Sequence, residues 1–302
     1  MITINDVEIK TVLDGMTWSG AKDMCCRTLT FSFLHCPFDK NIPVYKAKVG
    51  DKVVWSENDN ILFQGYIETM PYNTDDDTIQ VTCQDFMSRL MRSKAVGRFR
   101  GTLNELCNSI CGAFNLKNGV NVDNTHVHNI VSNGDLSYFE VLDTACKTMF
   151  ERYCLYLEGI TLKLAEHNSQ ATFEMGKSIR SSNFSQSISD MVTRVIMIDN
   201  DGKIKGVVEN KEDLETFGLF QEVYNYNKDS KNNLAEASKL LKSVTNEGGI
   251  VVDNNNACIS GRFITIHEPI NNFEGLFEIQ TDNHTIGADG SMELEVKYVA
   301  SR

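Results

Sequence analysis

The sequence lacks any long apolar run. Nowhere in its 302 residues is there an uninterrupted hydrophobic stretch of the ~18 residues that a membrane-spanning helix needs. Its first residues, MITINDVEIK, also lack the basic and then apolar pattern of a secretory signal. We therefore expect no membrane partner and a chain that is made in the cytoplasm.

Basic residues are scarce relative to acidic ones, and none of them form a run. The chain has 29 Lys and Arg residues against 41 Asp and Glu residues, which gives a formal net charge of −12. Binding to nucleic acid depends largely on neutralising phosphates with basic residues. The charge balance therefore argues against nucleic-acid binding as the main activity.

The motifs of common catalytic sites are missing as well. The chain has no Gly-x-Ser-x-Gly elbow, no phosphate-binding glycine loop, no His-Glu-x-x-His helix and no Cys-x-x-Cys pair. We predict no catalytic residue, no cofactor and no metal site, and we expect the chain not to be an enzyme.

Cysteine and histidine pairs could bind a metal ion, but each has a simpler interpretation. The nine cysteines are read as reduced thiols, because nothing marks the chain for secretion. Cys107 and Cys111 fall on the apolar stripe of an amphipathic helix, where cysteine packs as a small hydrophobic residue. His126 and His128 lie in a polar segment and are predicted to be solvated surface histidines.

Acidic groups give similarly weak signals. The aspartates at 75–77 could hold a cation, but a solvated turn between two strands is the commoner arrangement. Residues 199–202 begin like a calcium loop, yet Asn210 occupies the twelfth position, so a hairpin turn is predicted. Asp282 and His284 could act as an acid–base pair only with a nucleophile, and none is evident. We predict that this pair belongs to a bulge or turn.

The clearest positive signal is a set of three strands near the C-terminal end. Residues 262–267 carry a strand pattern that stops at Pro269, and 276–281 form a second strand. In the third, Met292, Leu294, Val296 and Tyr298 fall on one face while charged residues fall on the other.

A fainter copy of this pattern lies at residues 63–83. Aligning Gly65 with Gly275, and Thr78 with Ser291, leaves connections of similar length. The repetition predicts a duplicated β-module. Coincidence among ordinary hairpins is the alternative.

The predicted fold class is α+β and mainly β, with two tube-like β-barrel or sandwich modules and a small α+β domain between them. Residues 1–95 form the first module, with a short helix after Asp85, and 96–166 form the α+β domain. Residues 167–189 read as a linker or extended loop, and 190–302 as the second module with a helical insertion near 230–246.

Three local signals define the α+β domain. Thr102 with Glu105, and Ser137 with Glu140, match the capping box that starts a helix. The dipeptide at 158–159, Glu-Gly, predicts a tight hairpin.

Taken in order, these patterns resemble the XkdQ-type baseplate hub proteins of contractile phage tails and tail-like bacteriocins, a late-control protein D-like group. The matching segments are WSG at 18–20, RTLTFS at 27–32, GD at 50–51, FQGYI at 63–67, GDLS at 134–137, SGRF at 260–263 and the strand and turn at 275–284. Each segment is short, and their order along nearly the whole chain carries the resemblance.

The resemblance implies a structural hub: a homotrimer that joins the hexameric tail tube, or its initiator protein, to the trimeric central spike. Other baseplate proteins would be further partners, and DNA or a tape-measure protein would pass through the lumen. Such a chain is made in the bacterial host cytoplasm and assembled into a virion or bacteriocin tail baseplate. The candidate interface residues are Phe63, Gly65, Ile67, Phe263, Ile266, Gly275 and Phe277.

Two other functions stay open from the residues alone. A tail-associated peptidoglycan hydrolase would need a placed pair of carboxylates, and the acidic residues here are scattered. A cell-surface-binding tail protein would be expected to carry more exposed aromatic repeats than two tryptophans and scattered tyrosines provide.

Overall fold

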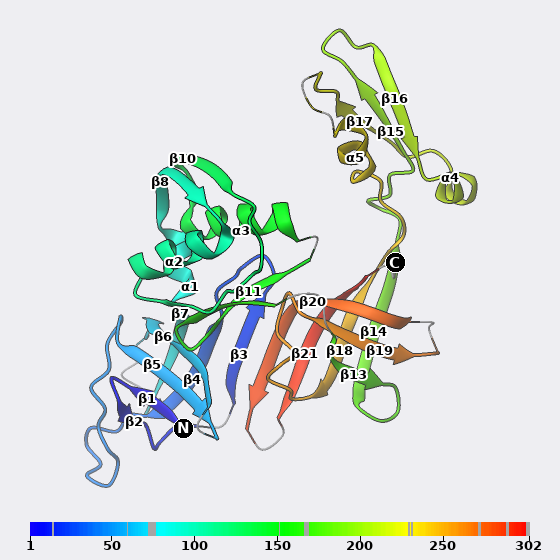
Figure 1. Ribbon diagram of the computed structural model, residues 1–302. Coiled ribbons are helices and arrows are strands. Elements are labelled where there is room, and N and C mark those ends of the chain that lie inside the picture. Colours follow the sequence, from blue (N-terminus) through cyan, green and yellow to red (C-terminus); the bar gives the residue numbers. More distant parts are fainter. Residues whose placement is uncertain are drawn as a thin grey trace. The chain divides into compact units, whose positions relative to one another are not determined.

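The computed structural model describes residues 1–13, 15–58, 60–71, 77–150, 152–165, 169–228, 230, 232–270, 273–287 and 290–299 (Figure 1). The chain forms two compact units, one made of residues 1–182 with 249–302 and the other of residues 183–248. The mainly β class predicted from the sequence is confirmed, with 51% of the described residues in strands and 15% in helices. Among these residues, no helix is long and apolar enough to span a membrane.

One large sheet dominates the first unit. Its N-terminal half consists of β1 (Ile2–Ile4), β2 (Val7–Glu8), β3 (Met16–Ala21), β4 (Thr28–Leu34), β5 (Lys52–Glu57), β6 (Asn60–Thr69) and β7 (Thr78–Asp85). Its C-terminal half consists of β13 (Ser169–Glu174), β14 (Ile179–Ser187), β18 (Thr245–Asp253), β19 (Phe263–Glu268), β20 (Phe273–Ile286) and β21 (Ser291–Tyr298). The strand path runs β14-β18-β21-β20-β3-β4-β7-β6-β5-β1-β2, with β19 on β20 and β13 on β19.

The two halves share one strand order. In the first half the strands lie in the order β3-β4-β7-β6-β5-β1, and in the second half in the order β14-β18-β21-β20-β19-β13, which is the same sequence of positions. One pairing differs in direction, because β1 is antiparallel to β5 whereas β13 is parallel to β19.

Hydrogen bonds fix how the halves align. The register shifts after Ile67 in the β6–β7 pair and after Ile279 in the β20–β21 pair. The Gly50 amide donates to the Ile67 carbonyl at 2.8 Å, and the Gly261 amide donates to the Ile279 carbonyl at 2.8 Å. Both glycines have positive φ, 90° and 83°. Ile67 and Ile279 are therefore equivalent positions.

This alignment changes one predicted correspondence and keeps the other. Thr78 does correspond to Ser291, because Cys83 and Val296 are the partners of the two equivalent isoleucines. Gly65 corresponds to Phe277 rather than to Gly275, whose counterpart is Phe63. An aromatic residue in one half thus occupies the position of a glycine in the other. The predicted match of Gly65 with Gly275 is therefore two residues out of register.

Alternating side chains explain why these segments form strands. Leu29, Phe31 and Phe33 of β4 are buried, as are Trp55 of β5 and Phe63 of β6, and together they form the core of the N-terminal half. Burying a large apolar side chain contributes on the order of 1.5–3 kcal/mol. Five such side chains on three strands of one sheet specify which face of the sheet turns inward.

A small α+β segment follows β7. It contains α1 (Met87–Arg92), β8 (Lys94–Gly101), α2 (Leu103–Ala113), β9 (Lys117–Asn118), β10 (His128–Ser137), α3 (Tyr138–Met149), β11 (Cys154–Glu158) and β12 (Thr161–Ala165). Both predicted capping boxes are present, and the hairpin joining β11 to β12 is confirmed. Cys107 and Cys111 lie in its apolar core, as predicted.

The second unit lies in the chain between β14 and β18, at the position that a short connection occupies between β3 and β4. It contains β15 (Arg194–Ile198), β16 (Ile204–Glu209), α4 (Lys211–Phe217), β17 (Gln221–Asn225) and α5 (Asn233–Ser238). The three strands form a sheet in the order β16-β15-β17. The hairpin turn predicted at 199–202 is confirmed, since β15 and β16 pair across it.

Several expectations differ from this structure. The described strands do not close into barrels, because β14 and β2 end an open path. Residues 167–189, expected to be a linker, include β13 and β14, which pair with distant partners. The expected boundary at 96–101 lies inside β8, and the insertion expected near 230–246 is part of a unit that spans 183–248.

Candidate functional site: the junction within the large sheet

The two halves of the large sheet meet where β3 pairs with β20. The pairs run antiparallel from Ala21 with Thr281 to Met16 with Ile286, and Figure 1 shows the two strands side by side. Residues more than 250 positions apart in the sequence thus share one hydrogen-bonded ladder. The glycine at 20 permits close approach here, because a Cβ on Gly20 would lie 2.6 Å from the Arg27 guanidinium.

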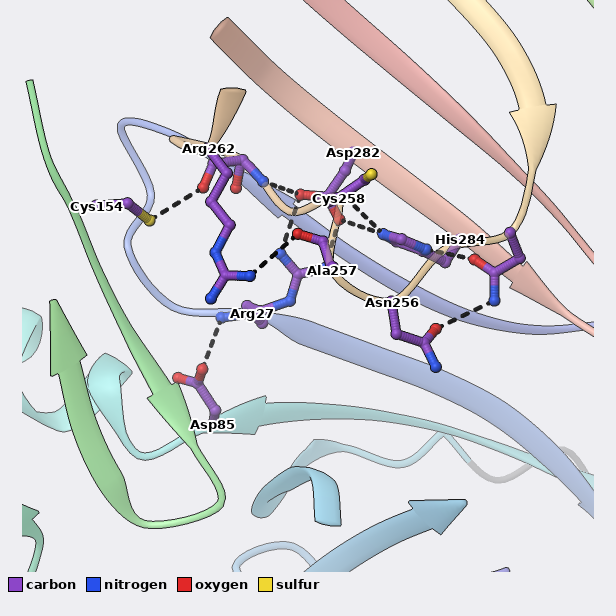
Figure 2. Close-up of polar contacts among 11 residues, drawn as sticks. Arg27, Asp85, Cys154, Asn256, Ala257, Cys258, Arg262, Asp282 and His284 are labelled. Atoms are coloured by element: carbon purple, nitrogen blue, oxygen red, sulfur yellow. Dashed lines mark hydrogen bonds and ion pairs between the residues drawn. The ribbon is translucent and has the colours of Figure 1, made fainter. Parts of the chain in front are cut away.

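A buried ion pair lies at this junction. The Arg27 guanidinium donates two hydrogen bonds to the Asp282 carboxylate, one of them at 2.9 Å from Nη1 to Oδ1 (Figure 2). The Ser260 amide donates to the same carboxylate at 2.6 Å. The Arg27 side chain also stacks on Trp18, 3.8 Å from the ring centroid. Bidentate pairing of this kind fixes both distance and orientation.

Two neighbouring carboxyl groups respond to this environment in opposite directions. Burial alone would raise the pKa of Asp282, but the Arg27 charge and the hydrogen bonds from His284 and Arg27 lower it well below its usual value. At Asp85, burial raises the pKa to about 7, although the amides of Arg27 and Met87 donate to it. Asp282 is therefore ionised at neutral pH, whereas Asp85 titrates near it.

His284 completes the cluster on the β20 side. Its Nδ1 lies 2.5 Å from the Asn254 side-chain oxygen, and its Nε2 lies 3.1 Å from the Cys258 carbonyl and 3.2 Å from Asp282 Oδ2. Both ring nitrogens thus have partners, and the ring is fully buried against Trp18. Asp282 and His284 lie beyond the β20 bulge, in regular strand, rather than in the bulge or turn predicted for them.

The polar contacts of this cluster hold strands and loops together, and its two thiols are protonated. Burial raises the pKa of the Cys154 thiol to about 11 and that of the Cys258 thiol to about 12, so neither is a thiolate at neutral pH. The Cys154 thiol instead donates to the Ser260 carbonyl. Arg262 binds the Ala257 carbonyl at 3.2 Å and stacks on Tyr156, which ties the α+β segment to the same loop.

The loop that precedes β19 crosses the junction. Ile259 is buried in the core of the N-terminal half, although it belongs by sequence to the C-terminal half. The Asn256 side chain also reaches Glu57 of β5, at 3.3 Å. Packing and polar contacts therefore supplement the backbone ladder between β3 and β20.

The structure locates the other candidate residues as follows. Phe63, Ile67, Phe263, Ile266 and Phe277 are all buried inside the chain. The ideal Cβ of Gly65 would lie 2.1 Å from the Gln84 carbonyl oxygen, and that of Gly275 would lie 3.0 Å from the Tyr298 ring. An interface role for these seven residues stays a prediction, and it would be indirect, through the strands they stabilise.

The histidine and aspartate candidates for a metal site differ in their exposure to solvent. His128 is buried and its Nδ1 lies 3.2 Å from the Thr148 hydroxyl, so the prediction of a solvated histidine is wrong at this position. Asp77 is exposed, whereas residues 75 and 76 lie outside the described part of the chain. No cluster of three or more potential metal ligands occurs among the residues whose placement is described.

Sequence reasoning missed Arg27 as a site residue. Its only local signal is that a basic residue directly precedes an apolar strand, and such residues are usually solvated. The partner that explains it, Asp282, is 255 positions away.

The pH dependence of stability tests the environment of Asp85. A carboxyl whose folded pKa is about 7, against 3.8 unfolded, holds more protons when folded between these values. The free energy of unfolding should therefore be highest below pH 4 for this group and fall as pH rises to 7, by at most about 4 kcal/mol. Chemical denaturation of the wild type and of Asp85→Asn from pH 4 to 8 measures the difference, which isolates this group from the histidines. Parallel pH profiles in the two proteins would contradict the assignment.

Comparison with known proteins identifies the family of this chain. The sequence matches the profile of a family described as YQBQ-like over residues 16–297, which is nearly the whole chain. The chain belongs to the YQBQ-like family. A search of curated protein sequences finds no match.

Solved structures of tail proteins share the fold of this YQBQ-like chain. The 43 kDa tail protein of prophage MuSo2 from Shewanella oneidensis has a TM-score of 0.73 at 13% identity, with 98% of this chain and 96% of that chain covered. A tail protein from Neisseria meningitidis MC58 has a TM-score of 0.68 at 11% identity, with 95% of each chain covered.

A third likeness comes from a secretion machine. An E. coli component of the type VI secretion system, described as structurally similar to the T4 tail proteins gp27 and gp5, has a TM-score of 0.52 at 10% identity. The alignment covers 99% of this chain and 77% of that chain. At such identities, these comparisons show a shared fold.

Proposed function

We propose that this YQBQ-like protein is a structural hub of a contractile tail, in which three copies join the hexameric tail tube to the trimeric central spike. The observation that carries the proposal is the shared strand order of the two sheet halves. Three chains with two equivalent halves each present six similar modules, which suits a sixfold partner on one side and a threefold partner on the other.

The junction between β3 and β20 supports the same proposal. In the second half, β14 occupies the position of β3 and is the last strand of the path on that side. A strand that ends a sheet and carries no proline or lysine is a site where another chain can pair. A neighbouring copy placed against β14 would extend the sheet from chain to chain, as β20 extends it from β3 within one chain.

The likeness to tail proteins favours this assembly over the two alternatives. Two of the compared structures are tail proteins, and the third is described as similar to two T4 tail proteins. The buried Asp282–His284 pair offers no substrate-accessible chemistry to support a peptidoglycan hydrolase. Tail tube, spike and other baseplate proteins are thus the expected partners, and DNA or a tape-measure protein would pass through the lumen.

Composition of purified particles tests the proposal. We expect quantitative mass spectrometry of tails to find this chain at three copies for every three copies of the spike protein. Absence of the chain from purified tails, or six copies in place of three, would contradict the proposed hub.

A further inference from the structure

The two-stranded ribbon of β8 and β10 has one face that is not used inside the chain. The inward face carries Ala95 and Phe99 of β8, which pack on the core of the α+β segment. The outward face, which we call the β8–β10 outer face, is formed by exposed side chains: Lys94, Val96, Arg98, Arg100, Asn129 and Val131.

The charge of this face is unusual for the molecule. The chain carries a net charge of −12, yet three side chains of the β8–β10 outer face are basic. The exposed acidic residue of β10, Asp135, lies at the Lys94 end, where its carboxylate accepts hydrogen bonds from the Asn133 amide and the Ser132 hydroxyl. Elsewhere on the chain, some exposed basic side chains form ion pairs with carboxylates, as Lys22 does with Glu278. Within the described part of the chain, neither Arg98 nor Arg100 has such a partner.

The positions of the basic groups are ordered. Arg98 donates from Nε to the Asn129 side chain at 2.6 Å, which holds its guanidinium on the surface. Arg100 lies opposite Asn129 in the ladder, two residues along the same face. Alternate residues on a strand are about 6.6–6.8 Å apart. The side chains of Arg98 and Arg100 therefore have the same spacing as alternate side chains of an extended peptide laid alongside them. Lys94, at the far end, donates to the Asp135 carbonyl and contributes less.

Apolar side chains lie among the basic ones. Val96 is 71% exposed and Val131 is 56% exposed. Val131 faces Arg98 across the ladder, and Val96 is on the same face one pair further along. A phosphate backbone would offer these valines nothing to pack against, whereas a polypeptide would.

From this pattern we infer that the β8–β10 outer face binds a segment of another protein whose side chains alternate between acidic and apolar residues. The carboxylates would pair with Arg98 and Arg100, and the apolar side chains would cover Val96 and Val131. This inference is independent of the trimer contacts proposed at β14, because it uses a different part of the chain.

The test uses the full chain and a defined probe. A fluorescein-labelled peptide that alternates Glu and Val should bind the wild-type protein, and fluorescence anisotropy should show weaker binding as salt rises above about 0.15 M. In the double variant Arg98→Glu/Arg100→Glu, two attractive contacts become repulsive, so we expect the affinity to fall about tenfold or more. The variant Lys46→Glu/Lys48→Glu makes the same charge change on another exposed segment and should bind as the wild type does.

Two further probes separate the alternatives. A peptide that alternates Glu and Ser should bind more weakly than the Glu and Val peptide, and Val96→Ser/Val131→Ser should remove that difference. A duplex DNA probe that binds more tightly than the peptide, with the same loss in Arg98→Glu/Arg100→Glu, would overturn the inference. Equal binding of the peptide to all variants would also overturn it.

Discussion

Replacing Asp282 with alanine is expected to lower the free energy of unfolding by about 3–5 kcal/mol, because it leaves a buried charge without its partner. The side chain of Asp282 is fully buried, and that of Arg27 is 7% exposed. The Arg27 guanidinium and the Ser260 amide lose their acceptor together, and His284 loses its contact with the carboxylate. Urea denaturation followed by circular dichroism measures the change.

A matched pair on the surface provides the control. Asp253 accepts hydrogen bonds from Arg180, but its side chain is 74% exposed. We expect Asp253→Ala to change the free energy of unfolding by no more than about 1 kcal/mol. The double variant Arg27→Met/Asp282→Leu should recover most of the stability lost in Asp282→Ala, since both charges are then removed. A loss below about 1 kcal/mol in Asp282→Ala would show that the junction does not depend on this pair.

Replacing Ile266 with aspartate should be still more damaging. Ile266 is fully buried on β19 and faces Gly275 of β20. A carboxylate placed there has no basic partner and must either stay charged in an apolar core or take up a proton. We expect a loss of more than about 4–5 kcal/mol, enough to abolish cooperative folding of the C-terminal half.

The control for this prediction lies one residue further along the same strand. His267 is exposed, so His267→Asp adds the same charge on the opposite face of β19, between Glu174 of β13 and Glu274 of β20. Repulsion between adjacent carboxylates across a ladder costs about 1 kcal/mol or less. Thermal unfolding should therefore remain cooperative in His267→Asp and be lost in Ile266→Asp. Normal unfolding of Ile266→Asp would contradict the strand assignment.

Local patterns in the sequence predicted the elements whose signals are contained within them. The capping boxes at Thr102 and Ser137, the alternation of β21 and the hairpin between β11 and β12 all depend on contacts a few residues apart. Such elements can be predicted without knowledge of the rest of the fold, because the residues in contact lie within one short stretch of sequence.

The junction could not be predicted in the same way. Arg27 and Asp282 are ordinary charged residues in their own segments, and only the pairing of β3 with β20 buries both. β13 and β14 are polar, which is typical of a linker, and their pairing with β19 and β18 depends on distant partners. The inserted unit could not be predicted for a related reason. It separates β14 from β18 in the sequence, and only their pairing in the sheet shows that the residues between them are an insertion.

The predicted alignment of the two sheet halves was wrong by two residues at Gly65. Gly65 and Gly275 are the visible landmarks, but the equivalent positions are Ile67 and Ile279, which the bulges and the bonds from Gly50 and Gly261 identify. A strand that slips by two residues keeps the same face inward, so the apolar pattern alone cannot correct such a slip. The slip is harder to detect because Phe63 corresponds to Gly275 and Gly65 corresponds to Phe277, so each half has one glycine and one phenylalanine two residues apart.

The measurement that tests the proposed hub most directly is the mass of the purified protein, alone and co-expressed with its candidate spike. One chain has a mass of 34.0 kDa, so a trimer should appear near 102 kDa in mass photometry, or as three copies in a complex with the spike. That result would support symmetry matching by a trimer of two-module chains. A monomer under both conditions would contradict the proposed hub and leave only the shared fold.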